Sequence, residues 1–257
     1  MAIRILVVAE APADWRMVAH LIDRKVLHYA PDLMQDAGSL EAVRIWCGIE
    51  ADSQFTSFSR LKKLAFDEHK SALRGAGPIG FSGSAREGFE WASVKKVLIL
   101  ARLGARPAPD AIVYSRDMDR RPRERKESIE NAISTIPDPP FVVVLALANP
   151  KREAWILNGF IVRNAAEEKR LSGLKKELGL DPCEKAEEVD VSTPGALKDA
   201  KRVLKKLTDG DHDRESECLN APWETLRKRG KNTGLAEFLE QVKDRIVPLV
   251  TGQSPRS

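Results

Sequence analysis

The sequence predicts an α/β fold, in which a mostly parallel sheet carries helices on both faces and is followed by a helical extension. Three short apolar runs, at residues 3–8, 112–114 and 141–147, have the composition of strands that are covered on both faces. Amphipathic helical patterns separate these runs. Strand and helix therefore alternate from residue 3 to about residue 165, which is typical of parallel strands joined by right-handed crossovers.

The bulk composition is that of a folded globular chain. Of the 257 residues, 42% are hydrophobic and 31% are charged, and this length favours one large domain or one domain with an appendage. No apolar run approaches the roughly 18 residues of a membrane helix, and no signal-peptide layout is present, so we expect a cytoplasmic protein. The net charge of +4 is too small to indicate nucleic-acid binding by itself. Cys47, Cys183 and Cys218 lie far apart in the sequence, and we expect buried thiols.

In the first third of the chain, a strand is followed by a helix and then by a second strand. The first strand leads to a helix from Pro12 to about Leu27, because proline suits a first helical turn and the apolar residues after it recur at helical spacing. Residues 42–47 form the second predicted strand. A helical patch follows at residues 58–65, and a glycine-rich loop at residues 75–84.

The central strand lies within residues 110–119, and the clearest strand of the chain is at residues 141–147. Predicted helices flank the central strand, at residues 87–103 and 120–136. After the last strand, Asn149 is expected to cap the next helix, with Pro150 at its first position.

The chain is predicted to divide into a core and an extension. Residues 1–165 form the α/β core, residues 166–250 form a helical extension packed on it, and residues 251–257 form a flexible tail. Helical segments are expected in the extension at residues 169–178, 194–207 and 234–246.

Acidic residues follow each of the three apolar strands. Glu10 and Asp14 come after the first strand, Asp117 and Asp119 after the central strand, and Glu153 one helical turn after the last. Because the carboxyl ends of parallel strands meet at one edge of a sheet, we expect these acids to form a cluster whose mutual repulsion is relieved by a divalent cation. Oxygen ligands without His or Cys favour Mg²⁺ or Mn²⁺ over Zn²⁺.

Basic residues lie beside these acids. Cations next to a metal site suit a polyanionic phosphate substrate, which predicts contacts with DNA or RNA. The predicted nucleic-acid-binding residues are Arg116, Arg120, Arg121, Arg123 and Arg152. Lys151 or Arg152 is also a candidate to stabilise charge in a transition state. A further basic group, residues 227–231, follows Trp223.

The acids after the first two of these strands resemble the two acidic motifs of Toprim domains, the fold shared by topoisomerases, DnaG-type primases and OLD-family nucleases. These acids are Glu10 with Asp14, and Asp117 with Asp119. Residues 148–157, which include Glu153 and Trp155, are similar to a segment of small bacterial Toprim-like proteins, including RloB-like families that are often encoded near phage-defence genes. The resemblance covers roughly the first 165 residues.

The resemblance implies a Toprim-like, Rossmann-like core that hydrolyses phosphodiester bonds of DNA or RNA with Mg²⁺ or Mn²⁺, in the setting of phage defence. The resemblance implies Glu10, Asp117 and Asp119 as the core acids. The candidate metal ligands are Glu10, Asp14, Asp117, Asp119 and Glu153, and the candidate catalytic residues are Glu10, Asp117, Asp119, Lys151 and Glu153. No tyrosine is placed as a topoisomerase nucleophile would require, so hydrolysis by a metal-activated water is expected.

Other interpretations stay open. Ala11 stands where Toprim domains have a glycine after the first glutamate, which favours a nucleic-acid-binding or scaffolding subunit with a degenerate core that acts with an ATPase or defence-complex partner. A phosphotransferase or sugar-nucleotide enzyme is a third alternative. Individual acids also have structural explanations: Asp117 and Asp119 as helix caps, Asp14 in favourable interaction with a helix dipole, and Glu153 paired with a neighbouring arginine.

Overall fold

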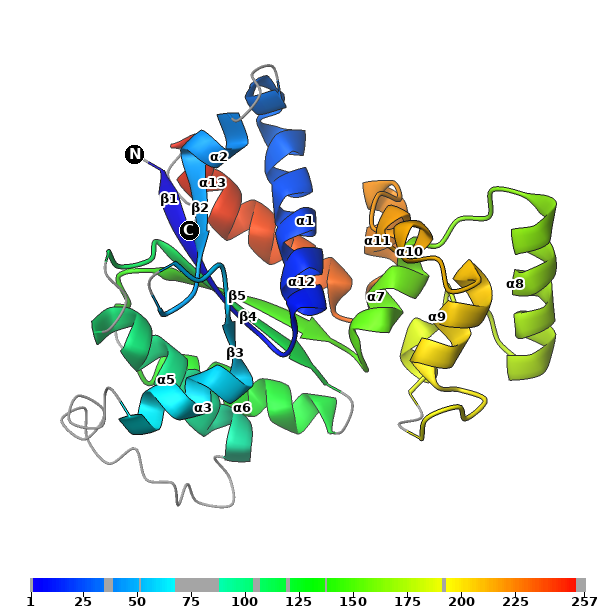
Figure 1. The fold of residues 1–257 in the computed structure, drawn as a ribbon, viewed down its shortest axis with the longest axis horizontal. Helices are drawn as coiled ribbons and strands as arrows, with labels where there is room; N and C mark the ends of the chain where they lie inside the picture. Colours follow the sequence, from blue (N-terminus) through cyan, green and yellow to red (C-terminus); the bar gives the residue numbers. More distant parts are fainter. Residues whose placement is uncertain are drawn as a thin grey trace. The chain divides into compact units, whose positions relative to one another are not determined.

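The computed structural model describes residues 2–34, 39–50, 52–67, 88–103, 107–118, 121–136, 138–190 and 193–252. Within these residues the fold is α/β, with five strands in one sheet (Figure 1). The strands are β1 (Ile3–Ala9), β2 (Arg44–Cys47), β3 (Thr56–Ser57), β4 (Ala111–Asp117) and β5 (Val142–Ala148). Their order is β2-β1-β4-β5, and β3 also pairs with β1. The predicted loop at residues 75–84 lies outside the described residues.

The strands that pair with β1 run parallel to it. Ile3 of β1 pairs with Arg44 of β2, and Val8 of β1 pairs with Tyr114 of β4 and with Thr56 of β3. A strand with neighbours on both sides and helices above and below has no face left for polar residues. Accordingly, residues 5–8 of β1 are fully buried.

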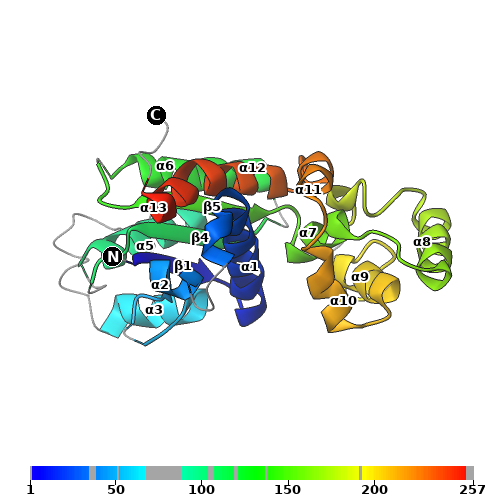
Figure 2. The same ribbon diagram turned by 90° about the horizontal axis from the view of Figure 1, so that it is seen from above.

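Helices cover both faces of the sheet (Figures 1 and 2). One face carries α1 (Pro12–Tyr29) and α13 (Val247–Thr251). The other carries α3 (Phe58–Asp67), α5 (Gly88–Leu103) and α6 (Pro122–Ser134). The predicted fold class, a mostly parallel sheet flanked by helices, is confirmed.

Asp110 joins the beginnings of three strands. Its carboxylate accepts a hydrogen bond from the backbone N–H of Arg4 (2.7 Å), and its own N–H donates to the Arg4 carbonyl (2.9 Å). Its carbonyl accepts from the N–H of Val142 (3.0 Å). One aspartate therefore ties β4 to both of its neighbours, β1 and β5, where these strands begin.

The outer edge of β5 is covered by side chains. The amide oxygen of Gln241 accepts a hydrogen bond from the Leu145 N–H (2.9 Å), and Arg245 donates to the Val143 carbonyl. Both side chains come from the helical stretch formed by α12 (Leu235–Gln241) and the π-helical segment Val242–Ile246. They satisfy backbone groups that an open sheet edge would otherwise expose.

The described chain divides into two compact units. The first comprises Met1–Ser115, Arg123–Leu145 and Gln241–Ser257, and the second comprises Arg116–Pro122 and Ala146–Glu240. The boundary expected at residue 165, between the α/β core and a helical extension packed on it, stays a prediction.

The second unit is mainly helical. Besides α12, its helices are α7 (Arg152–Gly159), α8 (Ala165–Leu178), α9 (Ala200–Thr208), α10 (His212–Cys218) and α11 (Trp223–Arg229). The helical segments expected in the extension overlap α8, α9 and α12, whereas α10 and α11 were not predicted. Each of these two helices has only seven residues, too few for a clear periodic pattern.

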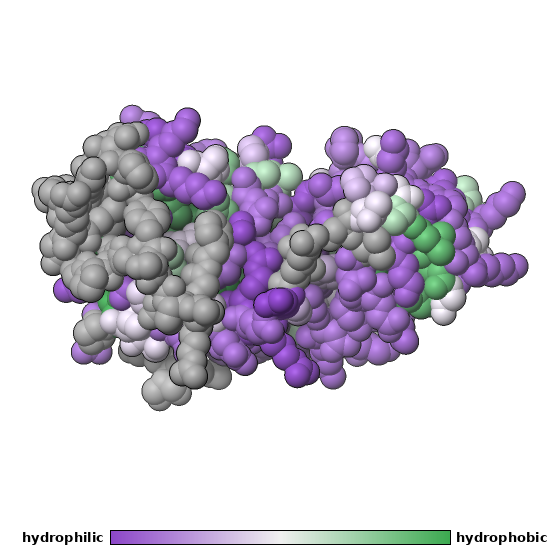
Figure 3. All heavy atoms as spheres, turned by 90° about the horizontal axis from the view of Figure 1, so that it is seen from below, coloured by the Kyte–Doolittle hydropathy of each residue, from purple (hydrophilic) through white to green (hydrophobic). Residues whose placement is uncertain are grey.

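None of the described helices is long and apolar enough to cross a lipid bilayer. One face of the molecule is mostly hydrophilic where residues are described (Figure 3). The cysteines Cys47, Cys183 and Cys218 are free and buried, as expected. Burial raises the pKa of the Cys183 thiol to about 12 and that of Cys218 to about 11.

A buried hydrogen-bond network connects α5, β4 and α6 in the first unit. The Tyr114 hydroxyl donates to Oε2 of Glu90 (2.9 Å), and the Arg125 guanidinium donates to Oε1 (2.6 Å). Tyr114 is 1% exposed and Glu90 is 5% exposed. A carboxylate at this depth is stable only when it is paired and hydrogen-bonded.

We expect Tyr114→Phe to lower the free energy of unfolding by about 1–2 kcal/mol, because it removes one hydrogen bond from a buried carboxylate. Urea denaturation measures the loss. Tyr29→Phe is the matched control, since the Tyr29 side chain is 45% exposed. Equal stability of the wild type and Tyr114→Phe would contradict the network's contribution.

In the second unit, Arg214 and Glu167 form a buried ion pair. Nε of Arg214 lies 2.7 Å from Oε1 of Glu167, and Nη2 also donates to the Ile161 carbonyl (2.7 Å). The guanidinium lies over the Phe160 ring, 4.6 Å from its centroid. The hydrogen bonds from Arg214 hold the pKa of the Glu167 carboxyl below its ordinary value.

A lowered pKa in the folded chain means that the unfolded chain binds more protons, so this pair stabilises the fold above the ordinary glutamate pKa of about 4.3. The stabilisation is lost as pH falls through the lowered pKa. We therefore expect the stability difference between the wild type and Glu167→Gln to be largest near neutral pH and to shrink below about pH 4. Urea titrations at a series of pH values test this, and a pH-independent difference would contradict it.

Candidate functional site

Glu10 and Asp14 belong to the first unit and lie at the junction of β1 and α1. Glu10 follows the last residue of β1 and is exposed. Asp14 is in the first turn of α1, where its Oδ2 accepts a hydrogen bond from the backbone N–H of Ala11 (2.9 Å). Asp14 therefore caps the start of the helix with a side-chain hydrogen bond, in addition to the favourable position near the helix dipole that the sequence left open for it.

Asp117 belongs to the second unit and ends β4. Its Oδ1 accepts a hydrogen bond from the backbone N–H of Arg152 (2.9 Å), the first residue of α7. Directly after it, the N–H of Met118 lies within hydrogen-bonding distance of the carbonyls of Ala148 (2.8 Å) and Pro150 (2.9 Å). Asp117 thus caps a helix, but that helix is α7 and not α6, which follows β4 in sequence.

The β5–α7 loop differs from its predicted structure. Asn149 does not cap α7, and Pro150 is not its first residue: the helix begins at Arg152, with Lys151 in the extended conformation before it. The groups of Asn149 are used elsewhere. Its N–H donates to the Thr233 carbonyl (2.9 Å), and its side-chain Nδ2 donates to the Asn232 carbonyl (2.9 Å). Asp117 supplies an acceptor for one of the amides that the start of α7 leaves unpaired.

Glu153 is buried in the first turn of α7. Its side chain is 5% exposed, and Oε1 lies 3.4 Å from Nη2 of Arg152. Lys151, the residue before the helix, is half-buried. Glu153 therefore pairs with a neighbouring arginine, the structural explanation that was left open for it.

The predicted nucleic-acid-binding arginines are spread over both units. Arg116 belongs to β4 and is half-buried, and Arg152 begins α7. Arg121 and Arg123 are exposed, and Arg121 has a positive φ of 53°. Asp119 and Arg120 lie outside the described residues.

The chemistry of the predicted ligands fits Mg²⁺ or Mn²⁺, because all of them are carboxylates. In the part of the chain that the structure describes, no three His, Cys, Asp or Glu side chains come close enough together to hold a metal ion. That part does not include Asp119. One oxygen of Asp117 is committed to the Arg152 N–H, and Glu153 is committed to the Arg152 guanidinium.

The sequence did not reveal that residues 230–234 contact the β5–α7 loop. Within this segment, the Thr233 carbonyl accepts from Nε1 of Trp155 (2.7 Å) as well as from Asn149, and the Thr233 hydroxyl donates to Oδ1 of Asn158 (2.6 Å). Thr233, Trp155 and Asn158 are each 0% exposed. Trp155 also stacks on Phe238, with 5.1 Å between ring centroids, so it is a core residue and not a platform for bases.

Two glycines at the ends of this segment are the only sequence signal for it. Gly234 has a φ of 83°, and a Cβ at this position would lie 2.2 Å from the Leu147 carbonyl oxygen. A Cβ at Gly230 would lie 2.4 Å from the Leu226 carbonyl oxygen. Both positions therefore require glycine.

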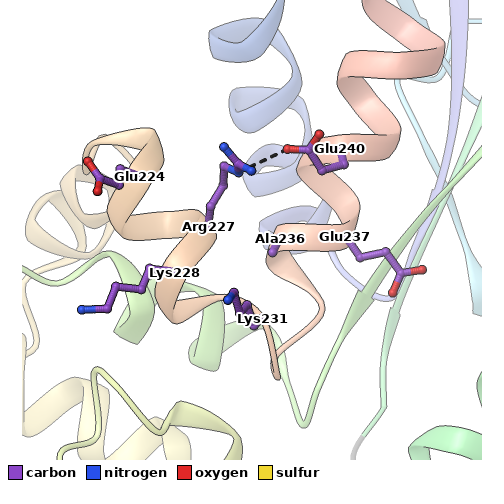
Figure 4. Close-up of a pocket in the computed structure, with 7 residues that line it drawn as sticks. All are labelled: Glu224, Arg227, Lys228, Lys231, Ala236, Glu237 and Glu240. Atoms are coloured by element: carbon purple, nitrogen blue, oxygen red, sulfur yellow. Dashed lines mark ion pairs between the residues drawn. The ribbon is translucent and has the colours of Figure 1, made fainter. Parts of the chain in front are cut away.

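A cavity of about 380 Å³ lies between α11 and α12 (Figure 4). Its lining residues are Glu224, Arg227, Lys228, Lys231, Ala236, Glu237 and Glu240. Nε of Arg227 pairs with Oε1 of Glu240 across the cavity at 3.3 Å. The cavity wall is thus mainly charged, and it lies entirely within the second unit.

Comparisons of the chain with protein-family models, curated proteins and solved structures find no match.

The Asp117 hydrogen bond predicts different effects for two substitutions. Asp117→Ala removes the acceptor of an α7 amide and should lower the free energy of unfolding by about 1 kcal/mol. Asp117→Asn keeps an oxygen acceptor, so it should lose only a few tenths of the unfolding free energy that Asp117→Ala loses. Urea denaturation distinguishes them, with Asp190→Ala, an exposed carboxylate of the same unit, as the control. Equal stability of Asp117→Ala and the wild type would contradict the capping function.

Proposed function

We propose that this chain is a Mg²⁺- or Mn²⁺-dependent nuclease of the Toprim type, which hydrolyses phosphodiester bonds of DNA or RNA in the cytoplasm, with a function in phage defence. The observation that carries the proposal is the strand order. β1 and β4 are parallel neighbours, and each is followed or ended by a carboxylate, Glu10 in one case and Asp117 in the other.

Open parallel sheets bind their ligands beyond the carboxyl ends of the strands. Glu10 and Asp117 are the first two ligands that the resemblance to Toprim domains implies for the proposed metal ion, and each stands at the carboxyl end of its strand. Asp119, outside the described residues, is the third acid that the resemblance to Toprim domains implies. The bound metal would supply an activated water and would neutralise charge on the leaving oxygen.

The contacts of the other candidate residues support separate functions for them. Asp14 and Glu153 are engaged in capping and ion pairing, so we propose that they support the site from within the protein, without binding the ion directly. Asp117 accepts a hydrogen bond from the backbone N–H of Arg152, and Lys151 is the residue before it. We assign to the side chains of Lys151 and Arg152 the stabilisation of charge on the scissile phosphate. Arg116, Arg121 and Arg123 are proposed to contact flanking phosphates.

The second candidate function is a nucleic-acid-binding or scaffolding subunit with a degenerate core, which acts with an ATPase partner. The observation that favours it is the engagement of Asp117 and Glu153 in contacts within the protein, together with the lack of a three-ligand group in the described residues. Such a subunit would bind nucleic acid without cleaving it.

Asp117→Asn and Glu10→Gln provide the test of cleavage, because each removes a metal-binding charge while keeping a side-chain oxygen. We expect each variant to lose on the order of 100-fold or more of the Mg²⁺- or Mn²⁺-dependent cleavage of labelled DNA or RNA. Asp190→Asn is the matched control and should cleave like the wild type.

Cleavage that persists in both variants would overturn the nuclease assignment. A wild type that binds the same labelled DNA or RNA but leaves it intact with Mg²⁺ and with Mn²⁺ would favour the binding subunit.

A further inference from the structure

The basic run at residues 227–231 contains four cations that are used in different ways. Arg229 is structural: it pairs with Glu184 at 2.7 Å and donates to the Phe160 carbonyl at 2.8 Å. Arg227 pairs with Glu240. Among the described residues, the side chains of Lys228 and Lys231 make no ion pair or hydrogen bond, and both residues are exposed. Two positive charges of this run are therefore left without an ion pair in the part of the chain that the structure describes.

Lys231 lies on a segment that is held rigidly. Thr233, two residues after Lys231, is fully buried and accepts hydrogen bonds from Trp155 and Asn149. Gly230 and Gly234 bound the segment at positions where a larger residue does not fit. A cation on a rigid backbone loses less conformational entropy when it binds a ligand than a cation on a mobile loop.

The acids of the cavity leave the two lysines accessible. Figure 4 shows Glu237 extending away from Lys231, while Arg227 points across the cavity toward Glu240. Glu224 lies in the first turn of α11, where a carboxylate interacts favourably with the helix dipole. Lys228 and Lys231 lie toward the other end of α11, around Gly230.

The same segment is attached to the β5–α7 loop, which carries two further cations. Asn149 of that loop bonds both Asn232 and Thr233, and Lys151 and Arg152 follow Asn149 by two and three residues. A ligand with regularly repeated negative charges can contact separated cations at once, whereas a small anion cannot. The phosphodiester backbone of a nucleic acid has such repeated charges.

We propose that Lys228 and Lys231 form a contact surface for the phosphodiester backbone of DNA or RNA. This inference rests on the proposed function and names a part of its substrate-binding surface. The two lysines hold the strand, while the chemistry is assigned to other residues.

The test is binding measured by fluorescence anisotropy with EDTA present, so that no cleavage occurs. The probes are labelled single-stranded DNA, double-stranded DNA and single-stranded RNA of one sequence. We expect Lys228→Ala and Lys231→Ala each to weaken binding roughly fivefold, and the double variant to reduce the slope of log affinity against log salt by about two. Lys231→Arg should retain the affinity. Lys169→Ala, an exposed lysine of α8, is the control and should bind like the wild type.

Comparison of the three probes identifies which nucleic acid the surface prefers. Unchanged affinity and salt dependence in the double variant would overturn the inference, as would an equal loss in Lys169→Ala or a wild type that binds none of the probes. Lysine-dependent binding by a wild type that cleaves nothing with Mg²⁺ or Mn²⁺ would support this inference while the proposed nuclease function fails.

Discussion

The hydrogen bond from the Arg152 N–H to the Asp117 carboxylate joins the end of β4 to the start of α7. Met118 adds contacts with the carbonyls of Ala148 and Pro150, so two chain segments that are distant in sequence are held together at the end of the sheet. A carboxylate in this position does two things at once. It satisfies an amide that the helix leaves unpaired, and it brings negative charge to the place where the proposed reaction would occur.

Thr233 performs a similar joining function with uncharged groups. Its carbonyl and hydroxyl bond Asn149, Trp155 and Asn158, and all of these bonds lie within the second unit. The β5–α7 loop is thus held by Asp117 through Arg152 and by Thr233 through Asn149. Polar groups that are fully bonded in a buried position specify one arrangement of the chain, because any other would leave some of them unpaired. The candidate catalytic residues Lys151 and Arg152 therefore lie on a well-defined backbone.

Much of the sheet could be predicted because its strands are continuous apolar runs. β1, β4 and β5 were recognised this way, and so was α1 from its helical spacing. The apolar composition of each strand is a property of that segment alone, so it can be read directly from the sequence. The start of α7 was mispredicted for the opposite reason: its cap comes from Asp117, which is 35 residues away, and local sequence rules favoured Asn149.

The candidate site could be predicted only in part. The alternation of strands and helices predicted parallel strands whose carboxyl ends lie at one edge of the sheet. It did not predict that β1 and β4 are neighbours, because alternation does not specify strand order. The contacts of Asp14 and Glu153 depend on the geometry of individual side chains, which composition does not specify. The attachment of residues 230–234 depends on backbone carbonyls, and the sequence marks it only by Gly230 and Gly234.

Calorimetric titration with Mn²⁺ tests the central claim, that Asp117 ends β4 as a metal-binding carboxylate as well as a helix cap. The wild type should bind Mn²⁺, and Asp117→Asn should bind it at least about tenfold more weakly while its urea midpoint stays close to that of the wild type. Equal Mn²⁺ affinity of the two proteins, or no binding by the wild type, would contradict the account.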